Sequence, residues 1–288
     1  KSSSEDGEEG WETGALPPVR TCDHRLGSPK VNSTVPCTCG KHFHILVFDP
    51  DNYSMMSHIR HNKLDRSELM SAMNFARNFA DDLLLPWEVD RIVYLDSDTI
   101  VHGDIIDLFS TRLDKDKGRF FAHPRLCKQT NDFWFNFRNS MVSRTLRPRG
   151  CAINAGVFVL DLVEYRREHV QQTIAKLIEN HERSIKKGSR GLWNRGVHQP
   201  SFALALANYS QEVDARWNVG QLGFVEGKRE AELRDALVLH WNGHRKPWLP
   251  KGLYSKYWLR YAIPLPAPPG SMLVGSCLAG SVEMDAGG

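Results

Sequence analysis

Three features are absent from this sequence: an apolar run long enough to cross a bilayer, a signal-like start and an internal repeat. Without the first two, nothing within the 288 residues predicts membrane insertion, and the fragment itself is expected to be soluble. The lack of a repeat argues against repeat architectures. Because the chain starts at Lys1 rather than Met, we keep a membrane anchor upstream of this fragment among the expectations.

An excess of charge of one sign is also missing. The 37 Lys and Arg residues nearly balance the 34 Asp and Glu residues, and the basic residues form no long block outside Arg183 to Arg190. Nucleic-acid binding is therefore not indicated. The hydrophobic content of 41%, with 10% aromatic residues, is ample for the packed core of a globular protein.

The chain has six cysteines, a moderate number for its length, which fits a reducing or an oxidising compartment equally well. Their pairing cannot be deduced from the sequence. Three Asn-x-Ser/Thr sequons, at Asn32, Asn52 and Asn208, favour the secretory pathway, although such tripeptides also arise by chance.

The sequence predicts one folded domain, residues 42–262, between two polar ends. Residues 1–41 are rich in acidic residues, serine and proline, so we expect a disordered linker or stem, and residues 263–288 are expected to form a disordered tail. The cysteines and histidines between Cys37 and His44 depart from the usual zinc-ligand spacing. A disulfide or free thiols are the preferred interpretation there, with a zinc site as the weaker alternative.

Short apolar stretches alternate with amphipathic segments along this domain. Strands are predicted at residues 44–48, 92–95, 120–122, 157–160 and 236–239, and helices at 65–83, 162–187 and 198–207. The alternation predicts an α/β fold with a mainly parallel sheet flanked by helices. The side chains expected to be buried are Leu46, Val93, Leu95, Val157, Val159, Val238 and Leu239.

The predicted strand at 92–95 runs directly into two carboxylates, Asp96 and Asp98. Side chains alternate along a strand, so both aspartates project from the same face and Ser97 points the other way. Neighbouring carboxylates repel each other unless a divalent cation lies between them, and oxygen ligands suit Mg²⁺ or Mn²⁺. An ordinary surface turn is the alternative interpretation, because Asp and Ser are common in turns.

His240 ends the predicted strand at 236–239 in the way that Asp96 ends its own strand, so its imidazole could join the same site. Mixed oxygen and nitrogen ligands favour Mn²⁺ over Mg²⁺. Gly243 and Lys246 follow His240 by three and six residues, which allows close backbone approach and supplies a cation. Together these residues predict a cradle for a diphosphate.

Two other stretches have open interpretations. On the helix at 65–83, Asn74, Arg77 and Asp81 share one face, which is either part of a site or solvated surface. Residues 123–150 are rich in aromatic and basic residues. That combination suits carbohydrate and anionic groups, although the phenylalanines suit a hydrophobic core equally well.

Several segments occur in the order typical of family 8 of the retaining glycosyltransferases, which this sequence resembles. They are NFARNFADDLL, YLDSDTIV, INAGVFVLDL, DARWNVGQLG and LHWNGHRKPW, and the resemblance spans about residues 44–261. The R-W-N and K-P-W segments are most similar to the plant galacturonosyltransferase-like branch. The resemblance implies a GT-A fold, a UDP-sugar donor and a glycan acceptor, for example a cell-wall polysaccharide.

The resemblance also assigns roles to residues of this chain. Asp96, Asp98 and His240 would bind Mn²⁺, or Mg²⁺ as the second choice, with the donor diphosphate. Gly243 and Lys246 would contact the phosphates. The other residues implied to bind the donor are Arg77, Asp81, Asn154 and Ala155.

Gln199 and Lys246 are the expected catalytic residues. Gln199 falls beside the anomeric carbon, where the family has an Asp-Gln pair, but this chain has His198 in place of the Asp. No carboxylate beside Gln199 is evident as a nucleophile. We therefore expect front-face transfer with retention, in which the leaving phosphate accepts the acceptor's proton and Lys246 stabilises the charge on that phosphate.

The resemblance is incomplete upstream, where the family has further strands and helices that bind the nucleobase. Here the polar residues 1–41 take their place, so we expect a truncated or degenerate member, and a catalytically inactive partner or scaffold is the alternative function. A haloacid dehalogenase-type phosphatase also places Asp-x-Asp after a strand. It is disfavoured because Ile100 stands where that motif has Thr or Val.

Overall fold

The computed structural model of this chain describes residues 33–36, 42–45, 72–84, 89–125, 127 and 129–262. The chain divides into two compact units, residues 1–65 and residues 66–288. Within the described part of the chain, no helix is both long enough and apolar enough to cross a membrane.

In the first unit, β1 (Ser33–Pro36) pairs in antiparallel fashion with β2 (His42–Ile45). β1 belongs to the segment that the sequence predicts to be linker or stem. Leu46 and the cysteines of the suggested zinc or disulfide cluster lie outside the described residues.

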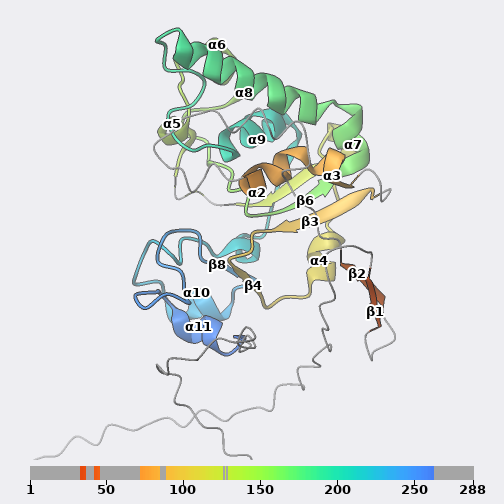
Figure 1. The fold of residues 1–288 in the computed structure, drawn as a ribbon, viewed down its shortest axis with the longest axis vertical. Coiled ribbons are helices and arrows are strands. Elements are labelled where there is room, and N and C mark those ends of the chain that lie inside the picture. The colour runs from red at the N-terminus through yellow and green to blue at the C-terminus, as the bar shows by residue number, and fades with distance from the viewer. Residues whose placement is uncertain are drawn as a thin grey trace, which may run out of the picture. The chain divides into compact units, whose positions relative to one another are not determined.

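The second unit is built around a four-stranded sheet with the order β3-β6-β5-β7. Figure 1 labels its neighbouring strands β3 and β6. Its strands are β3 (Arg91–Leu95), β6 (Val157–Asp161), β5 (Phe121–Pro124) and β7 (Ser210–Val213). β6 is antiparallel to both β3 and β5, whereas β5 and β7 are parallel. Three strands therefore share one direction and β6 is reversed. The predicted α/β class is confirmed, with a sheet of mixed pairing.

Burial within this sheet follows the position of each strand. All five residues of β6 are buried, as the apolar sequence of the first four predicts, and Val157 and Val159 are fully inaccessible to solvent. β3 has a described neighbour on one side only, and its residues keep partial exposure. Val93 and Leu95 are only partly buried and pack against the core cluster that contains Leu108 and Val157, so the prediction of burial holds in part for them.

Helices pack on both faces of the sheet. The α-helices in the described part of this unit are α2 (Ala72–Phe75), α3 (Ala80–Leu84), α4 (Ile105–Phe109), α5 (Asn131–Trp134), α6 (Ser140–Thr145), α7 (Leu162–Arg167), α8 (Val170–Lys186), α9 (Gln199–Leu206), α10 (Glu230–Arg234) and α11 (Ser255–Leu259). Short 3₁₀ helices are η4 (Ala76–Phe79), η6 (Lys115–Lys117), η7 (Ala207–Tyr209) and η8 (Ala215–Asn218). Phe158 and Leu160 face residues of α3, α7, α8 and α9, while Val157 and Val159 face Leu108 of α4 and Trp217 of η8.

The long helix predicted at 162–187 is two helices, α7 and α8. His169, between them, has a left-handed backbone with φ of 51°, which an α-helix cannot contain. Asp161 marks the start of α7, because its side chain accepts a hydrogen bond from the backbone N–H of Glu164. The prediction of one continuous helix is therefore wrong. Hydrophobic spacing alone does not reveal a single residue with a left-handed backbone.

A second, two-stranded sheet pairs β4 (Thr99–Val101) with β8 (Val238–His240) in antiparallel register. Val238 and Leu239 are fully buried, as predicted. Trp241 follows β8 and is fully buried, and its indole donates a hydrogen bond to the carbonyl of Leu253 at 2.8 Å. This bond ties the end of β8 to the segment before α11.

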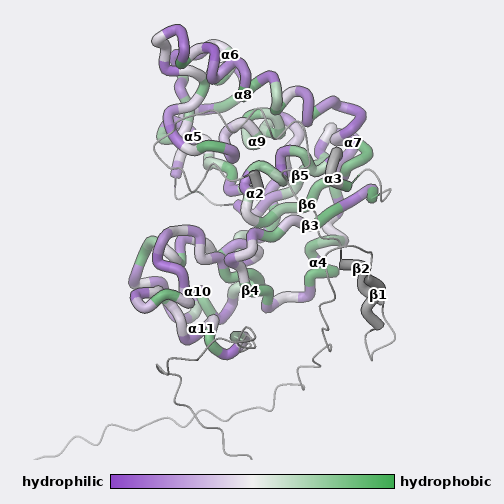
Figure 2. Tube along the Cα trace, in the orientation of Figure 1, coloured by the Kyte–Doolittle hydropathy of each residue, from purple (hydrophilic) through white to green (hydrophobic). Residues whose placement is uncertain are grey.

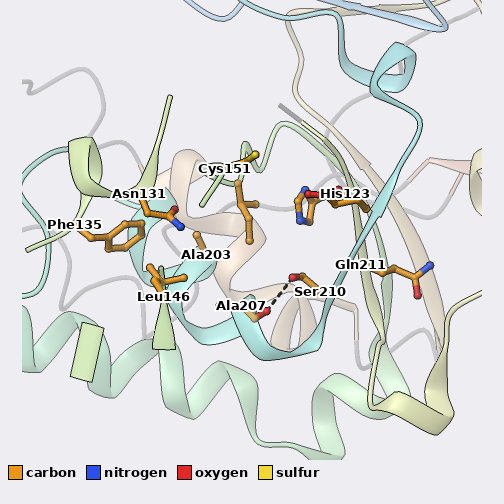
Figure 3. A pocket seen from close by; sticks show the side chains of 11 residues that line it. His123, Asn131, Phe135, Leu146, Cys151, Ala203, Ala207, Ser210 and Gln211 are labelled. Carbon is orange, nitrogen blue, oxygen red and sulfur yellow. Dashed lines mark hydrogen bonds between the residues drawn. The ribbon is translucent and has the colours of Figure 1, made fainter. Parts of the chain in front are cut away.

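The segment between β5 and β6 is closed by a disulfide between Cys127 and Cys151. Next to it lies a cavity of about 310 Å³, and Figure 3 shows His123 of β5 and Cys151 among its walls. Ile153 also lines this cavity and directly precedes Asn154. The disulfide and the cavity therefore adjoin the segment that leads into the candidate site.

Candidate metal and donor site

Asp96, Asp98 and His240 converge as the sequence predicts. Each offers one ligand atom, and these atoms lie within 4.8 Å of one another. The imidazole Nε2 of His240 is 3.5 Å from a carboxylate oxygen of Asp96 and 3.2 Å from one of Asp98. Because ligands of one ion must lie close together, this cluster has the size of a single cation site.

Local backbone bonds create this convergence. The D-S-D segment is the turn that joins β3 to β4, and the hydroxyl of Thr99 donates to the carbonyl of Asp96 at 2.8 Å. The antiparallel register places His240 opposite Thr99. The backbone N–H of Trp241 then donates to the carbonyl of Asp98 at 2.9 Å. D-S-D is therefore a turn, and its two aspartates also belong to a cluster that fits a divalent metal site.

Gly156 allows the elements to approach this closely. Its carbonyl accepts a hydrogen bond from the backbone N–H of Asp96 at 2.8 Å. A Cβ atom at this position would lie 2.3 Å from Cε1 of His240 and 2.7 Å from Oδ2 of Asp96. No larger residue fits here without displacing two members of the cluster, which gives the glycine of INAGVF a physical role.

A chain of amides sets the orientation of His240. Asn154 accepts hydrogen bonds at its side-chain oxygen from the backbone N–H of Gly156 at 3.0 Å and from Nδ2 of Asn218 at 3.1 Å. The side-chain oxygen of Asn218 therefore faces Nδ1 of His240, at 2.9 Å, and accepts its proton. Neutral His240 consequently directs the lone pair of Nε2 towards Asp96 and Asp98.

This arrangement fits a divalent cation. Nε2 of His240 is buried and makes no hydrogen bond with any described residue, although it lies between two carboxylates. A lone pair facing carboxylate oxygens is unfavourable unless positive charge lies between them. In the metal-free protein a proton on Nε2 supplies that charge, in line with the raised pKa of His240, and a bound divalent cation would take its place. Two oxygen ligands and one nitrogen ligand, held by a second set of hydrogen-bonding residues, form such a donor set.

The charges of the cluster depend on one another. Burial opposes ionisation of both carboxyls, yet contact with His240 and the Arg77 guanidinium lower the pKa of Asp96. Contact with His240 and Lys246 lowers the pKa of Asp98 strongly in the same way. Burial opposes the charged form of His240 as well, but the two aspartates raise its pKa. In the metal-free protein the excess negative charge is thus balanced by protein cations.

Arg77, in η4, connects the helical segment of residues 72–84 to the site. It is only 5% exposed, so the interpretation of its face as solvated surface is wrong at this position. Its guanidinium donates to Asp96 at 2.7 Å and to the backbone carbonyl of Ala155, and it lies over the ring of Tyr94 at 4.6 Å. The Tyr94 hydroxyl also bonds Asp96, at 3.0 Å. Arg77 therefore orients both Asp96 and the segment at Ala155.

Gln199 and Lys246 both belong to this network of contacts, through different partners. The carboxamide of Gln199 accepts from the backbone N–H of Ala155 at 3.2 Å and donates to the carbonyl of Ile153 at 3.1 Å. The ammonium of Lys246 contacts Asp98 and donates to the carbonyl of Trp241 at 2.8 Å. Gln199 thus fixes the backbone before β6, and Lys246 is held next to a predicted metal ligand.

Three other predicted or notable residues have different surroundings. Asp81 is paired with Arg166 of α7, so its contacts do not connect it directly to the aspartate cluster. Gly243 has φ of 126° and packs so tightly on Gly223 that a Cβ would lie 2.5 Å from that backbone. Burial, with the nearby Arg77 charge, lowers the pKa of His198 to about 3, so this imidazole is neutral at physiological pH. Their roles towards a donor stay predictions.

Asn218 and Tyr94 were not predicted as site residues. Asn218 lies in the segment DARWNVGQLG and Tyr94 in YLDSDTIV, so both belong to stretches that carry the family resemblance. The signal was the motif itself. What the sequence cannot show is that Asn218 of η8 and His240 of β8 meet across 22 positions of the chain.

We expect Asn218→Ala to weaken Mn²⁺ binding by about 10- to 100-fold, because residues behind a metal ligand have effects of this size. The imidazole would lose the acceptor at Nδ1 that fixes its tautomer and ring orientation. Calorimetric titration with Mn²⁺ measures the change. The matched control is Asn180→Ala on α8, whose described partners are Arg183 and Ser184 of the same helix. Equal affinity in both variants would contradict the orienting role.

Comparisons with known proteins agree with this geometry. The family model described as "Glycosyl transferase family 8" matches residues 35–252. Human "Glycosyltransferase 8 domain-containing protein 1" is 28% identical over 221 residues, which cover 70% of this chain and 57% of that protein. "Probable galacturonosyltransferase-like 6" of Arabidopsis thaliana is 34% identical over 195 residues, covering 64% of this chain and 52% of that protein.

Among solved structures, the fold is similar to that of the galactosyltransferase LgtC, determined in complex with donor and acceptor sugar analogues. The TM-score is 0.53 at 16% sequence identity, and the match covers 76% of this chain and 75% of LgtC. This likeness concerns the fold, which is of the GT-A type. The chain spans between half and three fifths of the length of the two curated relatives named above. Since the family model covers most of the sequence, the chain belongs to glycosyltransferase family 8.

Proposed function

We propose that this glycosyltransferase-family chain moves a hexosyl or uronosyl group from a UDP-sugar to a glycan acceptor, with Mn²⁺ as the preferred metal and Mg²⁺ as the second choice. The observation that carries the proposal is the geometry of His240, whose Nε2 faces two carboxylates with no hydrogen-bond partner among the described residues. A cation held there would lie beside Lys246, as binding of a diphosphate requires.

The residues divide into three groups around the donor. Asp96, Asp98 and His240 would hold the metal, whose positive charge stabilises a leaving diphosphate. Lys246 and Gly243 are proposed to contact the phosphates. The residues proposed to line the sugar, or its border, are Arg77, Asp81, Asn154 and Ala155.

Transfer with retention on one face of the sugar is the proposed mechanism. The bond between the anomeric carbon and the diphosphate oxygen breaks, and a bond from the acceptor oxygen to the same carbon forms on the same face. The leaving phosphate accepts the acceptor's hydroxyl proton, and Lys246 stabilises the negative charge that grows on it. The residues at this position are His198 and Gln199, and neither has a carboxylate. The Gln199 carboxamide is hydrogen-bonded to backbone groups. Both facts support a mechanism without a carboxylate nucleophile.

We also propose that the protein works in the lumen of the secretory pathway, in the Golgi apparatus. The Cys127–Cys151 disulfide supports this location, because disulfides persist in oxidising compartments. The sequon at Asn208 is consistent with it, since Asn208 is exposed in the folded protein.

A panel of UDP-sugars, each tested with Mn²⁺ and with EDTA, tests the proposal. We expect UDP release with one or a few donors in Mn²⁺ and none in EDTA. The NMR spectrum should show a product that keeps the anomeric configuration of the donor. An inverted anomer, or a glycosyl group trapped on the protein, would reject the mechanism. If the protein neither binds nor turns over any of the donors, that result would instead support a non-catalytic partner built on the same fold.

A further inference from the structure

Positive charge is strongly segregated in this chain. Residues 133–150 and 183–196 together hold nine Lys and Arg residues and no Asp or Glu. Subtracting these nine from the chain's 37 basic residues leaves 28 against 34 acidic residues, so everything outside the two segments is net negative. The small overall charge of +3 hides this separation.

The fold brings the two segments together. The backbone N–H of Asn136 donates to the carbonyl of Leu192 at 3.0 Å, and that of Asn194 donates to Trp134 at 2.8 Å. Val142 of α6 and Trp193 pack in the same hydrophobic cluster with Leu177 of α8. Figure 1 shows α6 beside the end of α8, and Figure 2 shows hydrophilic residues along both. We call the basic residues of 133–150 and 183–196 the basic surface.

Few of these charges are neutralised within the protein. All nine side chains are exposed, and Arg183 pairs with Glu179 of its own helix. Arg195 lies over the ring of Phe133, at 4.5 Å from its centre. The remaining seven have no ion pair with any described residue: Arg138, Arg144, Arg147, Arg149, Lys186, Lys187 and Arg190.

The basic surface borders the candidate site. Its first segment leads directly into Cys151 to Ala155, and its second leads into His198 and Gln199. These two continuations meet where Gln199 donates to the carbonyl of Ile153 at 3.1 Å. A linear polymer lying on the surface would therefore have a route to the site.

We propose that the basic surface binds the acceptor glycan through carboxylate or sulfate groups repeated along it. This inference rests on the proposed function, since it names the chemistry of the acceptor. Guanidinium groups bind carboxylates and sulfates with paired hydrogen bonds, and they form most of this surface. Phe133 is 42% exposed beside Arg195, which lies over its ring, so the exposed part of this aromatic side chain offers apolar contact to a sugar ring. The disulfide favours a compartment in which nucleic acids are not expected as partners.

Direct binding measurements test the inference with three probes of similar length. These are an oligogalacturonate hexamer for carboxylates, a heparin hexasaccharide for sulfates, and neutral maltohexaose. We expect at least one anionic probe to bind, with an affinity that falls as salt increases, while maltohexaose does not bind. Comparison of the first two identifies the anionic group.

Charge reversal locates the contact. Arg147→Glu with Arg149→Glu should weaken binding of the anionic probe by about tenfold or more, since two attractive contacts become repulsive. The matched control is Lys176→Glu with Lys251→Glu, which makes the same change in net charge at exposed positions elsewhere. The control should change the affinity by less than about threefold, and circular dichroism should show both variants folded.

The outcomes separate this inference from the proposed function. Binding is measured without donor, and the charge-reversed variant should keep the wild-type response to Mn²⁺ and UDP. Three results would overturn the inference: an equal loss of affinity for the anionic probe in the charge-reversed and control variants, binding of maltohexaose as tight as that of the anionic probes, or no binding of either anionic probe. Equally tight binding of single-stranded DNA would also overturn it, because the surface would then recognise charge alone. None of these results would affect a demonstrated transfer of sugar.

Discussion

Asp98→Ala is expected to abolish Mn²⁺-dependent activity while the protein stays folded. Asp98 faces both His240 and Lys246, so its removal deletes one metal ligand and one contact of the predicted phosphate-binding lysine. Loss of groups behind a ligand costs about 10- to 100-fold in metal affinity, and loss of the ligand itself should cost at least the upper value. Calorimetry with Mn²⁺ and a UDP-release assay measure the two effects.

The fold should tolerate this change for two reasons. The contact with Trp241 uses the backbone carbonyl of Asp98, which alanine keeps. Removing one of two neighbouring carboxylates also relieves their repulsion in the metal-free protein. Asp116→Ala, at an exposed position of η6, is the control and should behave as wild type. Activity that survives Asp98→Ala, with unchanged Mn²⁺ affinity, would show that the site is wrongly assigned.

Lys246→Ala is expected to slow the chemical step by about 10²- to 10³-fold, which corresponds to about 2–4 kcal/mol, as for other lost contacts to developing charge. Its ammonium is held by the carbonyl of Trp241, at 2.8 Å, and by Asp98, so it is positioned before substrate binds. The charge on the leaving phosphate grows towards the transition state. The variant should therefore lower kcat much more than it weakens acceptor binding.

Two companion variants make the test of Lys246 specific. Lys246→Arg keeps the positive charge and should recover part of the lost rate, whereas Lys251→Ala, exposed and five residues away, should have little effect. Gln199→Ala should also reduce activity, because the backbone at Ile153 and Ala155 loses both amide contacts. A Lys246→Ala enzyme that changes only the acceptor KM would place Lys246 outside the chemistry.

The sequence predicted that Asp96, Asp98 and His240 converge because they lie at the ends of short apolar strands, and the structure brings them together. Such strands end at the edge of a sheet, and polar residues at that edge tend to meet. The strands that bring Asp96 and His240 together differ from the predicted arrangement, however. Asp96 follows β3 in the four-stranded sheet, whereas His240 ends β8 in a separate pair with β4. The sequence predicted the proximity of these residues but not the second sheet that creates it.

Other features depend on contacts that no local pattern encodes. Asn218 orients His240 from a 3₁₀ helix whose sequence, ARWN, has no helical periodicity. β7, with the sequence SQEV, is polar and becomes a strand because it pairs with β5 in register. Gly156 predicts close backbone approach before β6, but the sequence does not show that the groups approaching it are His240 and Asp96. In each case tertiary pairing decides the structure.

The central claim is that Asp96, Asp98 and His240 bind a divalent cation through which the chain takes up UDP. The most direct measurement is calorimetric titration of the full chain with UDP, in Mn²⁺ and in EDTA, for the wild type and Asp98→Ala. The account predicts that UDP binds the wild type in Mn²⁺ but not in EDTA, and that it does not bind the variant in either condition. UDP binding of equal strength in EDTA, or unchanged Mn²⁺-dependent binding to Asp98→Ala, would contradict it.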